Sequence, residues 1–139
     1  SKKRRRIRNK AGNRKGLRLR PGIWKLRVRM KKCPYPMRFK VIGAKKGKGT
    51  FSGKKGKKVR VVAPKIWRLK AFAKRRIGRR KKWRAAKHKI KKRSRKRFDA
   101  LAEGDRNNDY NDLVIRARKI RNVRKKRKKR KRSRRRSQL

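Results

Sequence analysis

Few residues of this 139-residue chain could carry out catalysis. It has one His, His88 in the segment AAKHKIKK, and one Cys, Cys33. Neighbouring cations disfavour an imidazolium and favour a thiolate, but no His lies at a spacing that would pair it with Cys33. For His88 an incidental surface residue is favoured over a phosphate or base contact. Cys33 is interpreted as a small packing residue.

The five acidic residues all lie between Asp99 and Asp112, and no His lies among them. A lone Cys can form neither an internal disulfide nor a shared metal site. The sequence therefore predicts no catalytic residues, no metal, no cofactor and no enzyme. Asp109 followed by Asp112 resembles a capping box, and Gly104 could end a preceding helix, so the acids are expected to serve local structure.

The basic residues predict the partner. The chain has 62 Lys and Arg against 5 Asp and Glu, a formal net charge of +57, and only 32% of its residues are hydrophobic. Self-repulsion at this density opposes a compact state unless a polyanion neutralises it. Nucleic acid is the common partner with enough opposing charge. These observations predict nucleic-acid binding.

Aromatic side chains are spread through the basic sequence, where single-stranded bases could stack on them while cations hold phosphates. Trp24, Phe39, Trp67 and Phe72 fall in segments with strand or helix periodicity and are assigned to packing. Phe51, at the tip of the hairpin predicted for the segment rich in Gly and Lys, has no apolar neighbours in sequence and is the candidate for stacking on a base. A disordered, Lys-rich surface loop is the alternative for that segment.

Candidate RNA-binding residues are taken from the arms, the Gly- and Lys-rich segment and the basic runs. They are Arg4, Arg5, Arg6, Lys45, Lys46, Lys48, Phe51, Lys54, Lys55, Lys57, Arg79, Arg80, Lys91, Lys92, Arg93, Arg95, Lys96, Arg97, Arg127, Lys128 and Arg130.

Composition and periodicity divide the chain into four segments. The expected class is α+β: a small β-hairpin or three-strand element, then two or three basic helices, with extended basic arms at both ends. The segments are 1–22, an extended basic arm; 23–63, a β element with a long Gly- and Lys-rich hairpin; 64–121, a basic helical region; and 122–139, a basic tail.

The predicted strands alternate apolar and cationic residues or are short apolar runs. They cover 24–30, 37–42 and 59–62, with the hairpin over 43–58. Ile66, Leu69, Phe72 or Ala73, and Ile77 recur at helical spacing and predict an amphipathic helix over 65–77. Tyr110, Leu113, Val114, Ala117 and Ile120 would share one face of a later helix.

No run of eighteen apolar residues occurs, so neither a membrane span nor a membrane partner is expected. The N-terminus is followed by no apolar segment typical of a secretory signal. A transit peptide would be Arg-rich and poor in acids like the whole chain, so composition leaves that question open.

Three function classes suit a chain of this composition: a structural ribosomal protein, a DNA-condensing chromatin or viral core protein, and a nucleic-acid enzyme. The sequence speaks against the enzyme, because it contains no set of residues that could form a catalytic site. A DNA condenser can be a simple array of basic clusters. Mixed small elements with basic extensions suit folded ribosomal RNA better, because RNA offers unstacked bases and varied grooves. A structural constituent of the ribosome is favoured, and the DNA condenser is the alternative.

Two stretches resemble a known family. Arg38-Phe39-Lys40-Val41-Ile42-Gly43 is the first, and Lys65-Ile66, Lys70-Ala71-Phe72 and Lys74-Arg75-Arg76-Ile77 make up the second. With the basic run at 91–97, they resemble the bacterial and organellar large-subunit ribosomal protein numbered thirty-five, over residues 38–97. In the short bacterial form the two motifs are closely joined, whereas here the Gly- and Lys-rich hairpin and Val59 to Val62 lie between them.

The resemblance implies binding to ribosomal RNA and contacts with neighbouring ribosomal proteins, in the large subunit of an organellar, mitochondrial ribosome. A homo-oligomer is not expected.

Overall fold

The fold is known from a computed structural model that describes residues 7–29, 35–104 and 110–124, and these residues contain strands and no helix. The strands are β1 (Leu17–Leu19), β2 (Gly22–Arg29), β3 (Met37–Ile42), β4 (Gly49–Ser52), β5 (Lys58–Ala63), β6 (Trp67–Ile77), β7 (Arg80–Ala85), β8 (Lys87–Ser94), β9 (Arg97–Glu103) and β10 (Leu113–Arg121).

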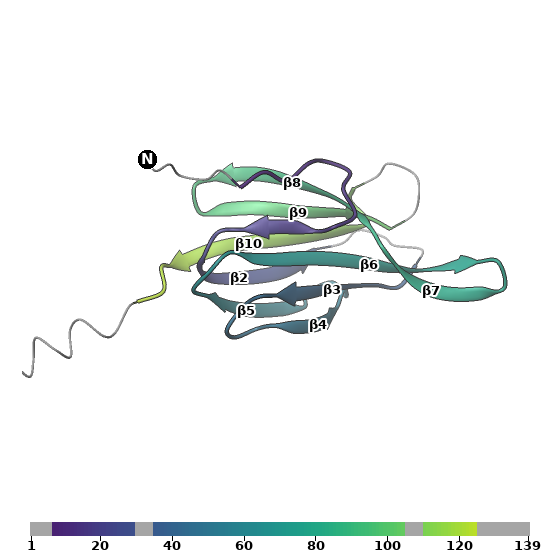
Figure 1. The fold of residues 1–139 in the computed structure, drawn as a ribbon, viewed down its shortest axis with the longest axis horizontal. Coiled ribbons are helices and arrows are strands. Elements are labelled where there is room, and N and C mark those ends of the chain that lie inside the picture. The colour runs from purple at the N-terminus through teal and green to yellow at the C-terminus, as the bar shows by residue number, and fades with distance from the viewer. Residues whose placement is uncertain (1–6, 30–34, 105–109, 125–139) are drawn as a thin grey trace, which may run out of the picture.

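The strands form two antiparallel sheets. The first, here called sheet A, has the order β5-β2-β10-β9-β8. The second, sheet B, has the order β1-β6-β3-β4, and β7 pairs with the far part of β6. The sheets stack as a sandwich, and the β6–β7 hairpin extends beyond it at one end (Figure 1).

A single hydrophobic core lies between the sheets, because each strand turns alternate apolar residues inward. Trp24 of sheet A and Trp67 of sheet B meet with ring centroids 6.3 Å apart, and Phe98 packs edge-on against Trp24 at 5.1 Å. Phe39 and Trp67 have no exposed surface. The assignment of Trp24, Phe39 and Trp67 to the core is confirmed.

The two buried indoles share one hydrogen-bond acceptor. Trp24 Nε1 donates to the carbonyl oxygen of Arg20 at 3.1 Å, and Trp67 Nε1 donates to the same oxygen at 2.9 Å. Buried indole N–H groups are costly without a partner. The connection between β1 and β2 therefore ties both sheets together through its backbone.

The predicted α+β class is wrong, because the described part of region 64–121 contains no helix and is built of strands. Over 65–77, Ile66 and Leu69 match a helical period, but Trp67, Leu69 and the alanines of β6 match a period of two, and this set is buried. Ile66 is 50% exposed and Phe72 lies on the outer face. Because two of the inward residues are Ala, which is common in helices, the sequence pattern did not distinguish strand from helix. The pairing of β6 with β1, β3 and β7 makes this segment a strand.

The predicted helix after Asp109 is also a strand, β10, whose buried residues Leu113, Ile115 and Ala117 again alternate. Asp112 caps no helix. Its Oδ2 accepts a hydrogen bond from the backbone N–H of Gly104 at 2.8 Å, which bridges the ends of β9 and β10. A carboxylate accepts a backbone N–H equally well at a strand connection and at a helix start.

The strands predicted over 24–30, 37–42 and 59–62 are confirmed as β2, β3 and β5 for their described residues. The long hairpin expected over 43–58 differs, because it contains a further strand, β4, which pairs with β3. The segment 43–48 also packs against the edge of β5, where Lys46 and Val62 form a bridge. Gly47 has φ +81° there, and a Cβ would lie 2.1 Å from the carbonyl oxygen of Arg60, so only Gly fits.

Part of the N-terminal segment belongs to the sandwich. Of the arm assigned to 1–22, Leu17 to Leu19 form β1, and Asn13 forms a backbone bridge with His88. Residues 125–139, most of the predicted basic tail, lie outside the described residues, as do residues 1–6 of the arm.

Candidate nucleic-acid interface

Strand alternation sorts the charges of the sandwich. Apart from the buried His88, the buried inward positions are apolar, and Lys and Arg occupy the outward positions of nearly every strand. Among the described residues, the acids Asp99, Glu103 and Asp112 are only 3–4% exposed. The described surface therefore presents cationic side chains without exposed carboxylates.

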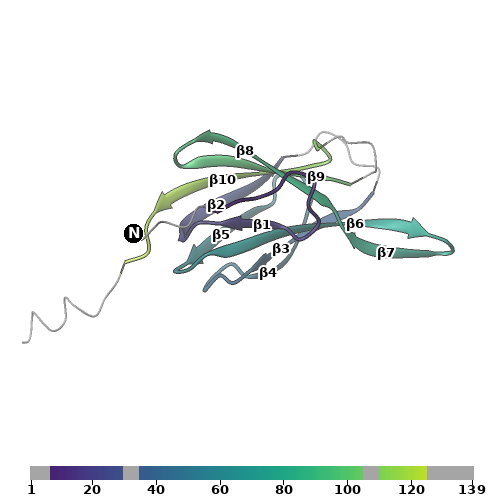
Figure 2. The same ribbon diagram turned by 45° about the horizontal axis from the view of Figure 1, so that its top comes forward.

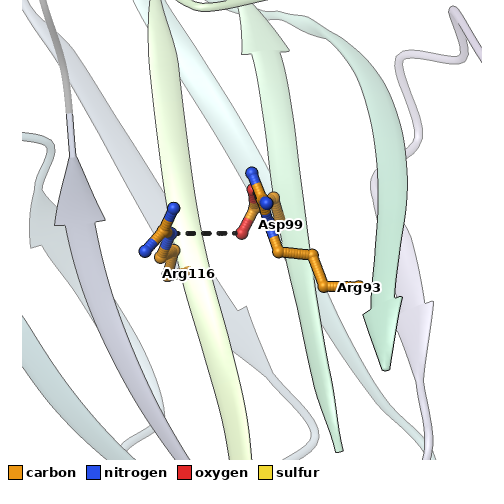
Figure 3. A network of polar contacts seen from close by, with 3 residues as sticks. All are labelled: Arg93, Asp99 and Arg116. Carbon is orange, nitrogen blue, oxygen red and sulfur yellow. Dashed lines mark hydrogen bonds and ion pairs between the residues drawn. The ribbon is translucent and has the colours of Figure 1, made fainter. Parts of the chain in front are cut away.

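On the outer face of sheet A, Asp99 lies between two arginines (Figure 3). Its Oδ2 accepts a hydrogen bond from Arg93 Nε at 2.7 Å, and its Oδ1 lies 3.6 Å from Arg116 Nε. The carboxyl group is buried, whereas both arginine side chains are about 45% exposed. A buried carboxylate on β9 thus lies beside one exposed guanidinium group from each flanking strand, β8 and β10.

These residues line a pocket of about 380 Å³. Leu101 and Val114 are cross-strand neighbours and form an apolar part of its lining. The polar residues of the lining are Arg29, Lys55, Lys91, Arg93, Asp99, Asn111 and Arg116.

The outer face of sheet B instead carries half-buried aromatic rings. The guanidinium carbon of Arg38 lies 4.0 Å from the centroid of the Trp83 ring, and Lys74 Nζ lies 6.0 Å from it. Lys70 Nζ lies 5.4 Å from the Phe72 ring. In such an arrangement a ring can stack on a base while the neighbouring cation binds a phosphate. Phe72, assigned to packing from the sequence, belongs to this aromatic face.

The β6–β7 hairpin projects from the body as a narrow two-stranded ribbon in both views (Figure 1 and Figure 2). Its sequence from Lys74 to Arg84, KRRIGRRKKWR, is Lys or Arg except for an Ile, a Gly and a Trp. Arg75 faces Lys82 and Arg76 faces Lys81. Like charges in direct cross-strand pairs are destabilising, so the ribbon gains most from an external anion.

His88 is a structural residue of the core. Its Nε2 accepts a hydrogen bond from the backbone N–H of Ala71 at 2.8 Å, and Nδ1 lies 3.1 Å from the carbonyl oxygen of Asn13. Burial, and secondarily the charge of Lys70, lower the pKa of His88 to about 4, although the Asn13 hydrogen bond opposes the shift. The imidazole is therefore neutral at pH 7, and the interpretation of His88 as an incidental surface residue is wrong.

The predicted RNA-binding cations are exposed wherever the structure describes them, and they fall into three separate regions. One is the pair of connections flanking β4, with Lys45, Lys46, Lys48, Lys54, Lys55 and Lys57. The second is the ribbon turn, with Arg79 and Arg80. The third is the β8–β9 hairpin, with Lys91, Lys92, Arg93, Arg95, Lys96 and Arg97. Arg4, Arg5, Arg6, Arg127, Lys128 and Arg130 lie outside the described residues.

The ends of β6–β7 and β8–β9 lie at opposite ends of the molecule (Figure 1). Two of the three regions meet in the pocket beside Asp99, which Lys55 of the β4–β5 connection lines together with Lys91 and Arg93 of the β8–β9 hairpin. Phe51 lies within β4 and not at a hairpin tip, and its ring packs 5.5 Å from that of Phe39.

Sequence reasoning missed Asp99 and Arg116 of the pocket and Arg38 and Trp83 of the aromatic face. Arg116 and Asp99 meet through a cross-strand register that spans the β9–β10 connection. The available signal was the period of two in β10, where Leu113, Ile115 and Ala117 turn inward and Arg116 therefore turns outward.

A scan of protein-family models, a search of curated proteins and a search of solved structures all give no match for this chain. None of the described residues belongs to a helix that could cross a membrane. Within 7–29, 35–104 and 110–124, no group of three His, Cys, Asp or Glu residues could hold a metal ion.

Proposed function

We propose that this protein is a structural RNA-binding protein that neutralises the phosphate backbone of a folded RNA. The observation that carries the proposal is the charge of the described surface, where cations cover both sheets while Asp99, Glu103 and Asp112 are buried. A cationic surface attracts a polyanion from every side, whereas it repels basic partners and gives neutral partners no comparable attraction.

The aromatic face supports RNA as the polyanion. Phe72 and Trp83 are half-buried and flanked by Lys70, Lys74 and Arg38. Folded RNA exposes unpaired bases that stack on such rings, whereas continuous duplex DNA keeps its bases stacked internally. The protein would act as a scaffold without catalysis.

We propose that the protein belongs to the large subunit of the mitochondrial ribosome. Its partners there would be ribosomal RNA and neighbouring ribosomal proteins. The support is the resemblance of residues 38–97 to the ribosomal family named above. The test is to fractionate ribosomes on a sucrose gradient and identify this chain by mass spectrometry. Co-sedimentation with the large subunit is expected, and its absence from all ribosomal fractions would remove the ribosome from the proposal.

A binding assay tests the RNA proposal independently of the particle. Each phosphate contact releases counterions, so the log–log plot of affinity against salt should have a slope magnitude above roughly 6 for structured RNA. A slope magnitude of about 2 would mean that few of the surface cations touch RNA. Duplex DNA of equal length, measured at the same salt, is the comparison.

A second candidate is a DNA-condensing chromatin or viral core protein. The β6–β7 ribbon favours it, because the major groove of B-DNA, about 12 Å wide, admits a two-stranded β-ribbon. Two-sheet sandwiches also occur among viral shell proteins. Tighter binding to duplex DNA than to structured RNA, with compaction of long DNA, would favour this candidate over RNA.

A further inference from the structure

We infer that the pocket beside Asp99 on the outer face of sheet A is a discrete phosphate-binding site, which holds one phosphate group of the nucleic acid in a fixed position. This inference rests on the proposed function and adds to it a single built site among many general contacts. Five cations and one carboxylate line the pocket, a formal net charge of +4.

The contacts of Asp99 leave the donor ends of both arginines available. Asp99 approaches Arg93 and Arg116 through their Nε atoms, at 2.7 Å and 3.6 Å. A guanidinium has five N–H donors in a rigid planar fork, so the terminal nitrogens remain to bind a second anion. Two guanidinium groups on β8 and β10, the strands on either side of β9, form a preorganised clamp for phosphate oxygens.

A bulge in β8 places one of these arginines. Lys91 pairs with Asp99, Lys92 pairs with Phe98, and the register then shifts so that Ser94 pairs with Arg97. Arg93 is the residue left unpaired by this shift. An extra residue re-aims its side chain, and such bulges concentrate at functional positions.

The neighbouring loop completes the cationic lining. The Gly56 N–H donates to the carbonyl oxygen of Val28 at 2.9 Å, and the Val28 N–H donates to that of Lys57 at 2.9 Å. These bonds hold residues 54–57 beside the end of β2, where Lys55 and Arg29 line the pocket. Leu101 and Val114 provide an apolar surface on which a sugar or base could lie next to the bound phosphate.

Burial of Asp99 suits a positioning role. Its side chain is 4% exposed, and Oδ1 has no hydrogen-bond partner among the described residues. An isolated buried carboxylate is expensive, and here the two arginines compensate it. In return the carboxylate restrains two long side chains that would otherwise lose rotamer freedom when an anion binds.

The sign of one substitution separates this site from general charge attraction. Asp99→Asn removes a negative charge, so general attraction predicts tighter binding to any polyanion. The clamp predicts weaker phosphate binding, because Arg93 and Arg116 lose their anchor. Glu103→Gln is the matched control, since Glu103 is also buried on β9 but does not line the pocket.

The first measurement uses the full chain and inorganic phosphate, with chloride at equal ionic strength as reference, and follows the Nε–Hε signals of the arginines by NMR. Selective shifts of Arg93 and Arg116 in the wild type, weakened about tenfold in apparent affinity by Asp99→Asn and unchanged by Glu103→Gln, are expected. Equal shifts of all arginines, or tighter binding by Asp99→Asn, would overturn the site.

A second pair of variants keeps the test valid if Asp99→Asn does not fold. Arg116→Ala should weaken binding of a short 5′-phosphorylated oligonucleotide about tenfold more than Arg118→Ala, the next outward residue of β10. Competition by adenosine monophosphate would identify a free nucleotide as the preferred source of the phosphate, and its failure would identify the strand; either outcome keeps the site. If the two variants weaken oligonucleotide binding equally while the wild type binds RNA, only the pocket is refuted. If the wild-type protein does not bind RNA at all, the proposed function is refuted.

Discussion

The sandwich body and the β6–β7 ribbon share one continuous strand, β6, but different interactions stabilise them. In the body, β6 buries Trp67, Leu69 and Ala71 at 0–3% exposure. In the ribbon, the residues from Lys74 to Ala85 contribute no member of the described core cluster. Hydrophobic burial therefore stabilises the body, and the ribbon depends on its backbone ladder.

We therefore expect the body to supply the folding stability and the ribbon to contribute to the proposed RNA binding. Substitutions in the body should change stability with little effect on the salt dependence of binding. Substitutions in the ribbon should change binding while the body stays folded, because the hydrophobic core of the body contains no ribbon residues.

The largest effect is expected in the body. Trp67→Ala should destabilise the protein by about 3–5 kcal/mol, since it removes a fully buried ring and leaves the Arg20 carbonyl with one indole donor. Urea unfolding at fixed salt measures this. Ile66→Ala is the control, because Ile66 is half exposed and should cost far less. Similar costs for the two would contradict the core described above.

The next effect is the pH dependence of the body. The folded pKa of His88 is lowered to about 4 from 6.5, so the unfolded state binds a proton first as the pH falls. This contribution to stability is fully present above pH 6.5 and lost between pH 6.5 and pH 4, and amounts to about 3 kcal/mol at 1.36 kcal/mol per pKa unit.

Unfolding measured across this range in the wild type and in His88→Asn checks the expectation. The variant should be less stable at pH 7 and should lack the steep loss between pH 6.5 and pH 4. Parallel pH curves for the two proteins would show that His88 does not titrate with folding.

Binding of single-stranded RNA should depend on the ring at the base of the ribbon. Trp83→Ala is expected to weaken it by about 1–3 kcal/mol, the value of one base stacked on an aromatic ring. Trp83→Phe should keep most of the affinity. A fluorescence titration at one fixed salt concentration measures both, and equal losses for Ala and Phe would argue against stacking.

The smallest effect concerns the like-charge pairs of the ribbon. Arg76→Thr removes the repulsion with Lys81 and places a β-branched residue in a strand, so stability should rise by roughly 0.2–1 kcal/mol. The log–log salt slope for RNA should fall by about 0.7 to 0.9 if this cation contacts phosphate. Arg76→Lys keeps the charge and should change neither quantity. A stability loss in Arg76→Thr would mean that Arg76 packs on the body.

The sequence by itself determined the charge and the strands with bulky alternating residues, and a polyanionic partner is the prediction that follows from that charge. Residues 24–29 and 37–42 are recognisable as strands because Trp, Leu, Val, Met and Phe alternate with Lys and Arg. Only a two-residue period places all of these bulky apolar side chains on one buried face. The exposure of Lys45 and Arg79 was likewise predictable, because a cation in a turn or connection points to solvent, and their contact with RNA stays a prediction.

Only the tertiary structure decided the remaining strands and the pocket. From Trp67 to Ala73 the inward residues include two alanines, which fit a helix as well as a strand, and pairing with β1 and β3 selects the strand. Asp99 and Arg116 are brought together by the β9–β10 register. Neither neighbour relation is encoded locally, because long-range backbone hydrogen bonds set the register and the register sets which charges meet.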